Sequence, residues 1–326
     1  MDTKMPSVLC VDDEPNILRT MNWMLRKEFH VMTAPDGPTA LQMLRTHDFD
    51  VIVSDQRMPQ MMGSEFLRQA CALAPRAMRI LLTGYSDMPA ILKSINEGEV
   101  FRFVNKPWSN EELICTVREA AAIAQANPAP PAAPEVARSE AVAGGERILV
   151  LDQDPQLLKM LQQVAPKGTH FWPAHSLSDA IEVLDAEPVA VVVSETRLGR
   201  VDTTPLLKLL KKARPETVTI VISEDSDVET VVKLINQAQV YRFIPKPVQP
   251  NFLRIMLASA VQKHLSMTKE PAYARRHQVE RLPAWMREKV LSDVQSEVDR
   301  SPAALAVGGA SFVDLLGDKV RRLFAA

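Results

Sequence analysis

The feature that most constrains this chain of 326 residues is an internal repeat at a constant offset of 140 residues. The segment 51–58 reads VIVSDQRM, and the segment 191–198 reads VVVSETRL. In the same register, EVFRFVNKP at 99–107 matches QVYRFIPKP at 239–247. No insertion or deletion is needed between these matches. Two copies of about 120 residues indicate a tandem domain duplication rather than a solenoid of short repeats.

The stretch between the two copies has the composition of a linker. Residues 127–145 read NPAPPAAPEVARSEAVAGG. Alanine and small polar residues cannot build a packed core here, and the prolines favour an extended, semi-stiff spacer. We therefore expect a first domain over residues 5–125, a linker over 126–145, a second domain over 146–265 and a helical C-terminal extension over 266–326.

Within each copy, short apolar runs alternate with stretches of helical periodicity. In the first copy the expected strands are 7–11, 31–33, 51–54, 79–83 and 100–104, and the expected helices are 16–26, 38–45, 64–72, 88–97 and 111–124. The strands are almost continuously apolar, which is typical of strands that are buried on both faces. This alternation predicts an α/β fold in which each copy forms a doubly wound parallel sheet of five strands.

Polar residues follow the strands at the sheet edge where such folds bind ligands. Asp12 and Asp13 follow the first strand, Asp55 follows the third, Thr83 ends the fourth, and Lys106 follows the fifth. Three neighbouring carboxylates repel one another and require a cation, and hard oxygen ligands suit Mg²⁺. A metal ion with a nearby lysine forms a pocket for a phosphoryl group, in which an aspartate can be the nucleophile. The threonine and the lysine can bind the phosphoryl oxygens.

Four motifs at these strand ends resemble the receiver domain of two-component response regulators: VDDEP at 11–15, SDQRMP at 54–59, LLTG at 81–84 and FVNKPW at 103–108. The resemblance covers residues 5–125 and implies a flavodoxin-like fold. It implies that Asp55 accepts a phosphoryl group from the phosphohistidine of a sensor histidine kinase or a histidine phosphotransfer protein. It further implies that Mg²⁺ is held by Asp12, Asp13, Asp55 and the backbone carbonyl of Arg57, and that the phosphoryl-binding and switch residues are Thr83, Phe103 and Lys106.

The second copy departs from this pattern at the same positions. They are occupied by Asp152, Gln153, Glu195, Ser223 and Lys246. Glutamate replaces the phosphoacceptor and glutamine replaces one metal-site acid, so this copy resembles a degenerate pseudo-receiver. Glu224 also stands where the first copy has Gly84. Two interpretations remain. In one, the longer Glu195 side chain reaches toward Lys246 and Ser223, forms an ion pair there and partly imitates a phosphorylated state. In the other, the pocket is inert and the domain serves packing or partner binding.

The C-terminal extension contains two amphipathic stretches. Apolar residues recur at helical spacing in Met286, Val290, Val294 and Val298, and again in Phe312, Leu316, Val320 and Leu323. Two short helices do not easily form an independent core. We expect them either to pack on a receiver or self-associate, or to form an output that docks onto a partner protein.

Composition narrows the classes of function. The chain has 38 Lys+Arg against 40 Asp+Glu, so it has no overall basic footprint for nucleic acid. Its apolar runs are far shorter than the ~20 residues that span a bilayer, so we expect no membrane insertion. Three scattered cysteines, Cys10, Cys71 and Cys115, indicate reduced thiols in a cytoplasmic protein rather than a disulfide framework.

The sequence therefore predicts a cytoplasmic response regulator that is not an enzyme beyond its own phosphotransfer and dephosphorylation. Phosphorylation of Asp55 would change contacts with the second receiver, with a downstream protein target or with another copy of the chain in a homodimer. One alternative is a DNA-binding transcriptional regulator that acts through the C-terminal extension. Others are a regulatory subunit of a cyclic-dinucleotide phosphodiesterase and a hydrolase of small phosphoesters.

Overall fold

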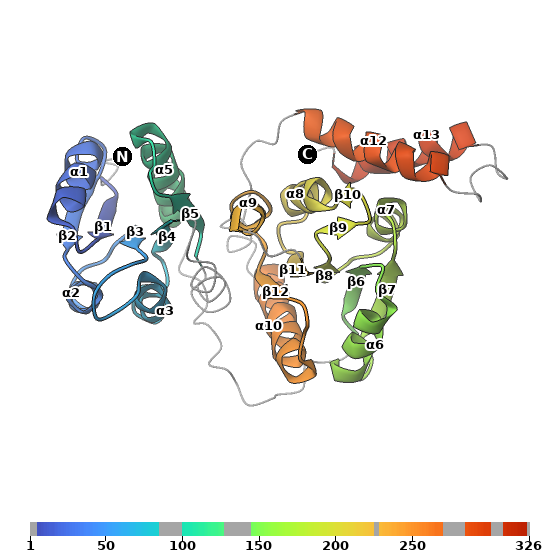
Figure 1. Cartoon of the computed structure of the whole chain (residues 1–326), viewed down its shortest axis with the longest axis horizontal. Coiled ribbons are helices and arrows are strands. Elements are labelled where there is room, and N and C mark those ends of the chain that lie inside the picture. Colours follow the sequence, from blue (N-terminus) through green and yellow to red (C-terminus); the bar gives the residue numbers. More distant parts are fainter. Residues whose placement is uncertain are drawn as a thin grey trace. The chain divides into compact units, whose positions relative to one another are not determined.

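The computed structural model describes residues 5–84, 100–126, 145–224, 228–269, 284–300 and 309–324 (Figure 1). Two compact units can be distinguished. One consists of Met1–Ala137 with Asp227–Asn236, and the other of Arg138–Ser226 with Gln237–Ala326.

The first unit contains a five-stranded parallel sheet in the order β2-β1-β3-β4-β5. Its strands are β1 (Ser7–Val11), β2 (His30–Ala34), β3 (Val51–Asp55), β4 (Met78–Thr83) and β5 (Arg102–Asn105). Helices α1 (Pro15–Leu25) and α5 (Asn110–Ala126) contact each other on one face, and α2 (Gly37–Leu44) and α3 (Gly63–Leu73) do so on the other. The predicted doubly wound fold is confirmed. The expected helix over 88–97 lies outside the described residues.

Local sequence explains where these elements begin. Residues 8–11 of β1 and 51–53 of β3 are fully buried, as the continuous apolar runs predict for strands covered on both faces. Helix α1 begins at Pro15, where the missing N–H has no helical partner to lose. Helix α2 begins after Asp36, whose Oδ1 accepts a hydrogen bond from the N–H of Thr39 at 2.7 Å.

The second unit repeats this topology in a sheet of order β12-β11-β8-β6-β7. Its parallel strands are β6 (Arg147–Leu151), β7 (His170–Ala174), β8 (Val191–Ser194), β11 (Val218–Ser223) and β12 (Arg242–Pro245). The helices that follow these strands in the chain are α6 (Pro155–Val164), α7 (Leu177–Ala186), α8 (Thr204–Ala213), α9 (Val228–Ala238) and α10 (Pro250–Lys269). Most of α9 falls within the segment Asp227–Asn236 that is grouped with the first unit. Helices α6 and α10 contact each other, and Met267, near the end of α10, packs into the core.

The loop after the third strand distinguishes the two copies. In the second copy it forms an antiparallel hairpin of β9 (Arg197–Leu198) and β10 (Val201–Asp202). The hairpin turns at Gly199, whose φ of +61° is a conformation that glycine adopts without a steric penalty. The corresponding residues of the first copy, 57–62, form no strand. The edge that carries the ligand site is therefore built differently in the two domains.

The C-terminal extension contains α12 (Ala284–Arg300) and α13 (Gly309–Leu323), which pack against α7 in the second unit (Figure 1). Helix α12 also contacts α8 and α13. The buried apolar residues of the pair are Met286, Val290, Val294, Leu316, Val320 and Phe324. The predicted helices are confirmed, and they pack on the second domain, as one of the two expectations for them states.

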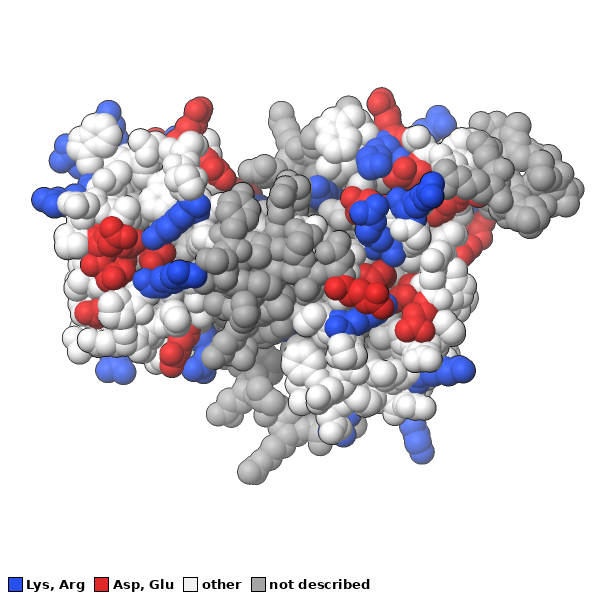
Figure 2. Space-filling view, viewed as in Figure 1, with Lys and Arg blue, Asp and Glu red and all other residues white. Residues whose placement is uncertain are grey.

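In the described part of the chain, no helix is both long and apolar enough to cross a membrane. On the face shown in Figure 2, basic and acidic side chains are interspersed over both units. This mixed surface accompanies the near balance of charges in the composition, a formal net charge of -2.

Candidate functional site

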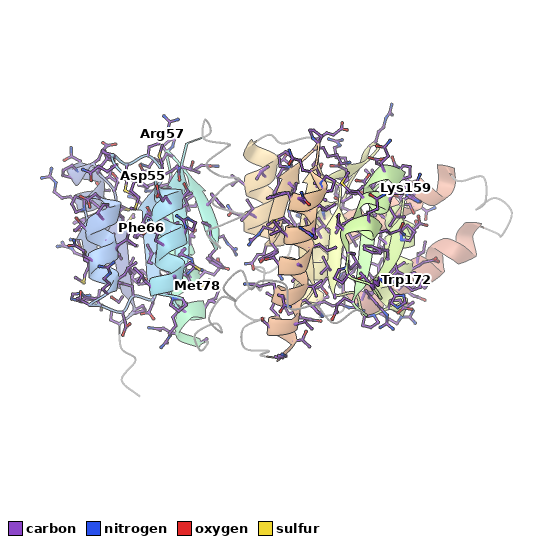
Figure 3. The ribbon with its side chains drawn as sticks, turned by 90° about the horizontal axis from the view of Figure 1, so that it is seen from below. Asp55, Arg57, Phe66, Met78, Lys159 and Trp172 are labelled. Carbon is purple, nitrogen blue, oxygen red and sulfur yellow. The ribbon has the colours of Figure 1, made fainter. Side chains whose placement is uncertain are left out.

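Four of the predicted site residues of the first copy lie at the carboxyl edge of its sheet. Figure 3 shows Asp55 and Arg57 at one end of the domain and Met78, the first residue of β4, at the other. Parallel strands bring their carboxyl ends to a common edge, so Asp12, Thr83 and Lys106 lie at the same end as Asp55. Asp12, Asp55 and Thr83 are buried there.

A single ammonium group joins the two buried carboxylates. The Nζ of Lys106 lies 2.6 Å from Oδ1 of Asp55 and 3.3 Å from Oδ2 of Asp12. The remaining oxygens are bound by the backbone: Oδ1 of Asp12 accepts from the N–H of Glu14 at 2.8 Å, and Oδ2 of Asp55 accepts from the N–H of Arg57 at 3.0 Å. These contacts hold both carboxylates in defined orientations at the carboxyl edge of the sheet.

The electrostatics of this group follow from burial and from the shared lysine. Burial raises the pKa of Asp12, and the negative charge of Asp55 adds to the increase, while the Glu14 N–H and Lys106 oppose it. Burial alone would lower the pKa of Lys106, but hydrogen bonds and charges from Asp55 and Asp12 outweigh it and raise that pKa. One ammonium therefore balances the charge of two carboxylates incompletely, and a second cation nearby would stabilise the ionised form of Asp12.

The donor chemistry of this edge suits Mg²⁺, although the predicted ligands are not preassembled. Asp12 and Asp55 supply hard carboxylate oxygens, and Asp13 is exposed beside them. Among the described residues, no group of three or more His, Cys, Asp or Glu side chains is arranged to hold a metal ion. The structure thus brings Asp12 and Asp55 together through Lys106 but does not bring Asp13 to them.

The two remaining predicted switch residues are both buried. Thr83 ends β4, its Oγ1 donates to the carbonyl of Gly84 at 3.2 Å, and its own carbonyl accepts from the N–H of Lys106 at 2.9 Å. Phe103, in β5, pairs with Leu81 of β4 and has 2% of its surface exposed. In this structure Phe103 is therefore part of the core, three residues before the lysine of the pocket.

One residue that positions the loop after Asp55 was not predicted from the sequence. Gly63, the first residue of α3, packs so closely against β3 that a Cβ atom there would lie 2.0 Å from the backbone oxygen of Asp55. Its N–H donates to the carbonyl of Gln56 at 3.0 Å, and the Gln56 side chain accepts from the N–H of Ser64 at 3.0 Å. The loop that follows Asp55 is thereby fastened to the strand. A glycine eight residues after the aspartate was the available signal.

The second copy repeats the shared-lysine arrangement. The Nζ of Lys246 lies 2.8 Å from Oε2 of Glu195 and 3.0 Å from Oδ2 of Asp152. Oδ1 of Asp152 accepts from the N–H of Asp154 at 2.7 Å, as Asp12 does from Glu14. Burial opposes the charge on Lys246, but the hydrogen bonds that it donates to Glu195 and Asp152 raise its pKa.

The other groups of the second pocket are bound to neighbours. Oε1 of Glu195 accepts from the N–H of Thr196 at 2.8 Å and from its hydroxyl at 3.1 Å. That hydroxyl also lies 2.7 Å from the hydroxyl of Ser223. Gln153 donates its side-chain N–H to the carbonyl of His175 at 3.4 Å. Both carboxylate oxygens of Glu195 are therefore occupied by groups of the same domain.

Comparison with known proteins identifies the family. The sequence model of the response regulator receiver domain matches twice, over residues 8–118 and 148–258. The chain therefore belongs to the response regulator receiver family of two-component systems and carries two receiver domains in tandem.

Among curated proteins, the hydrogenase transcriptional regulatory protein HoxA of Cupriavidus necator is 37% identical over 120 residues, which are 37% of this chain and 25% of that protein. The transcriptional regulatory protein GlrR of Escherichia coli is 30% identical over 121 residues, or 27% of its length. The chain thus spans about a quarter of these relatives. A solved signal receiver domain of an HD domain-containing protein from Pseudomonas fluorescens Pf-5 is 35% identical, with a TM-score of 0.37, and the match covers 38% of this chain and 93% of that one.

Proposed function

We propose that the first receiver is a phosphorylation switch and that Asp55 is its phosphoacceptor. The observation that carries the proposal is the shared ammonium of Lys106, which holds Asp55 and the buried Asp12 at the carboxyl edge of the sheet. The donor would be the phosphohistidine of a sensor histidine kinase or of a histidine phosphotransfer protein. We also propose, as predicted from the sequence, a cytoplasmic location and a chain divided into a first receiver, a linker, a second receiver and a C-terminal extension. Their bounds are 5–125, 126–145, 146–265 and 266–326.

In the proposed reaction, a carboxylate oxygen of Asp55 attacks the phosphorus of the donor. The phosphorus–nitrogen bond breaks, the imidazole keeps the electron pair and takes up a proton, and an acyl phosphate forms on Asp55. Mg²⁺, held by Asp12, Asp13, Asp55 and the Arg57 carbonyl, would neutralise phosphoryl charge when bound. Lys106 then moves its ion pair from Asp55 to a phosphoryl oxygen, because the carboxyl group of Asp55 carries no charge once it is part of the acyl phosphate.

The consequence of the reaction reaches Thr83 and the ends of β4 and β5. The carbonyl of Thr83 is bonded to the N–H of Lys106, so a shift of Lys106 pulls on the end of β4. The hydroxyl of Thr83, now 3.2 Å from the carbonyl of Gly84, is free to turn and donate to the phosphoryl group. Such changes at the ends of β4 and β5 would alter the surface offered to a downstream protein or to a second copy of the chain. This is the output of a signalling domain and not of an enzyme that acts on an external substrate.

We further propose that the second receiver is not phosphorylated and that its pocket rests in the inert state. The distances from Lys246 to Glu195 and Asp152 reproduce the unphosphorylated pairing of Lys106 with Asp55 and Asp12. A side chain that imitated a phosphoryl group would instead engage Ser223 directly. Here the hydroxyl of Thr196 lies between the Glu195 carboxylate and that of Ser223. This pattern favours inertness over imitation.

The test is phosphorylation of the full chain by a radiolabelled small phosphodonor, with Mg²⁺ and with a chelator. We expect wild type and Glu195→Ala to take up label with Mg²⁺, and Asp55→Asn to take up none. Asp50→Asn is the matched control, because Asp50 stands at the other end of β3 and its Oδ2 accepts from the N–H of Ser7 at 2.8 Å, away from the pocket. Label on Asp55→Asn would overturn the assignment of the phosphoacceptor and the inertness of the second receiver together.

None of the three alternatives from the sequence gains a supporting observation in the part of the chain that the structure describes. Arg322 and Lys319 of α13 are paired with acids of α7. A cluster of basic residues in the extension, formed by Arg275, Arg276, His277 and Arg281, lies outside the described residues. The transcriptional roles in the names of the relatives belong to proteins of which this chain spans about a quarter.

A further inference from the structure

The packing of the C-terminal helices on the second receiver includes a specific polar anchor. Glu297, near the end of α12, places its carboxylate at the first turn of α7. Oε1 accepts from the N–H of Leu177 at 3.0 Å, and Oε2 accepts from the N–H of Ser178 at 3.2 Å and from its hydroxyl at 3.1 Å. The first N–H groups of a helix have no partner within the helix, and the positive end of the helix dipole attracts a carboxylate. The Glu297 carboxylate supplies an acceptor for these N–H groups and a negative charge at the positive end of the dipole.

Two ion pairs align the second helix of the extension on the same surface. Arg322 lies 3.0 Å from Asp185, and Lys319 lies 3.6 Å from Glu182, both acids being on α7. The guanidinium of Arg287 in α12 also donates to the carbonyl of Phe324, which joins α12 to the end of α13. Exposed pairs of this kind contribute little stability but set register and orientation. The apolar residues between them, Val290, Leu316 and Val320 among them, are completely buried.

The same positions in the first receiver could not accept these helices. Ser178 corresponds to Pro38, which has neither an N–H nor a hydroxyl to offer a carboxylate. Asp185 corresponds to Arg45, which would repel Arg322. Glu182 corresponds to the uncharged Gln42. The features that receive the extension therefore occur only in the second copy.

We propose that α12 and α13 form an intramolecular ligand specific for the second receiver, which closes its α7–α8 face. Glu297 and Arg322 determine the specificity. A partner that binds this face must first displace the extension, so the second receiver has a surface whose access is set by the chain itself. The proposal does not depend on phosphorylation of Asp55, and its failure would leave the proposed function intact.

The test is hydrogen exchange by mass spectrometry on the full chain with charge-swapped variants. We expect Glu297→Ala to speed exchange at the first turn of α7 by roughly 2- to 30-fold, the range that corresponds to loss of a helix cap. Arg322→Glu should speed exchange in α13, and the double change Arg322→Glu with Asp185→Arg should restore it. The matched control is Lys289→Glu, which breaks the pair of Lys289 and Asp293 within α12 and leaves the contacts with α7 untouched.

Three results would overturn the proposal. The first is an exchange rate in Glu297→Ala equal to that of the control. The second is a double variant no better protected than Arg322→Glu alone. The third is protection of α13 that falls when the wild-type chain is diluted, because the ligand would then come from a second copy. A rescued double variant with protection independent of concentration supports the intramolecular ligand.

Discussion

Replacing Gly63 with alanine tests how Asp55, the proposed phosphoacceptor, is positioned. The new Cβ would lie 2.0 Å from the backbone oxygen of Asp55, 2.8 Å from its carbonyl carbon and 3.0 Å from Cα of Gln56. Normal contact between such atoms is about 3.5 Å, so the start of α3 would have to move from β3 by about 1.5 Å. Both sides of the clash are backbone, and no side chain can rotate to relieve it.

We expect Gly63→Ala to lower the free energy of unfolding of the first receiver by about 2–3 kcal/mol, the upper part of the range for overpacked sites. For a domain of about 100 residues this corresponds to a fall in Tm of about 8 °C or more. The displaced loop would also weaken the contact between the Arg57 N–H and Asp55, so labelling by a small phosphodonor should fall. Calorimetry of the full chain measures the first effect, and the labelling assay measures the second.

The matched control is Gly84→Ala in the same domain, because a Cβ at Gly84 would have no atom within 4 Å. We expect this variant to unfold close to the wild-type temperature. If Gly63→Ala and Gly84→Ala have the same Tm and the same labelling, the close approach of α3 to β3 does not position Asp55, and the reasoning is wrong.

Two further predictions concern pH. Burial is the main cause that raises the pKa of Asp12 above its unfolded value of 3.8. The stability that Asp12 contributes is therefore complete below pH 3.8 and is lost as the pH rises through the folded pKa. The Tm of Asp12→Asn should exceed that of wild type most at neutral pH, and this difference should shrink toward about pH 4. A constant difference in thermal melts would contradict this. Burial and the charge of Lys263 lower the pKa of Lys211 from 10.5 to about 7, so the contribution of Lys211 is complete above 10.5 and is lost as pH falls toward 7. The difference between the Tm of Lys211→Met and that of wild type should then decrease as the pH rises from about 7 to about 10. An increase would refute the burial argument.

Much of the first site could be predicted because it depends on periodicity and on the geometry of parallel strands. Apolar runs of strand length, alternating with helical stretches, allow few arrangements other than a doubly wound sheet. Once the strands are parallel, the residues that follow β1, β3 and β5 must share an edge. Asp12, Asp55 and Lys106 were therefore expected near one another before any contact was known.

The contacts made by individual side chains at that edge could not be predicted in the same way. Asp13 follows Asp12 directly, yet only Asp12 turns inward to Lys106. The role of Thr196 between Glu195 and Ser223 depends on the β9–β10 hairpin that follows it. Such details depend on loop conformations, which local residue preferences leave open.

The sequence by itself determined that the chain is a duplicated α/β fold with acids and a lysine at one edge of each sheet, because a constant offset and strand periodicity are local properties of the chain. It also showed that Glu195 stands in the second copy where the first copy has Asp55. Only the tertiary structure decided that α12 and α13 seat on α7 and α8. Their amphipathic pattern is compatible with many apolar surfaces, whereas Glu297 reaches the first turn of α7 across some 120 residues of chain. Contacts at that separation arise from the folded shapes of both elements and have no signature in either segment alone.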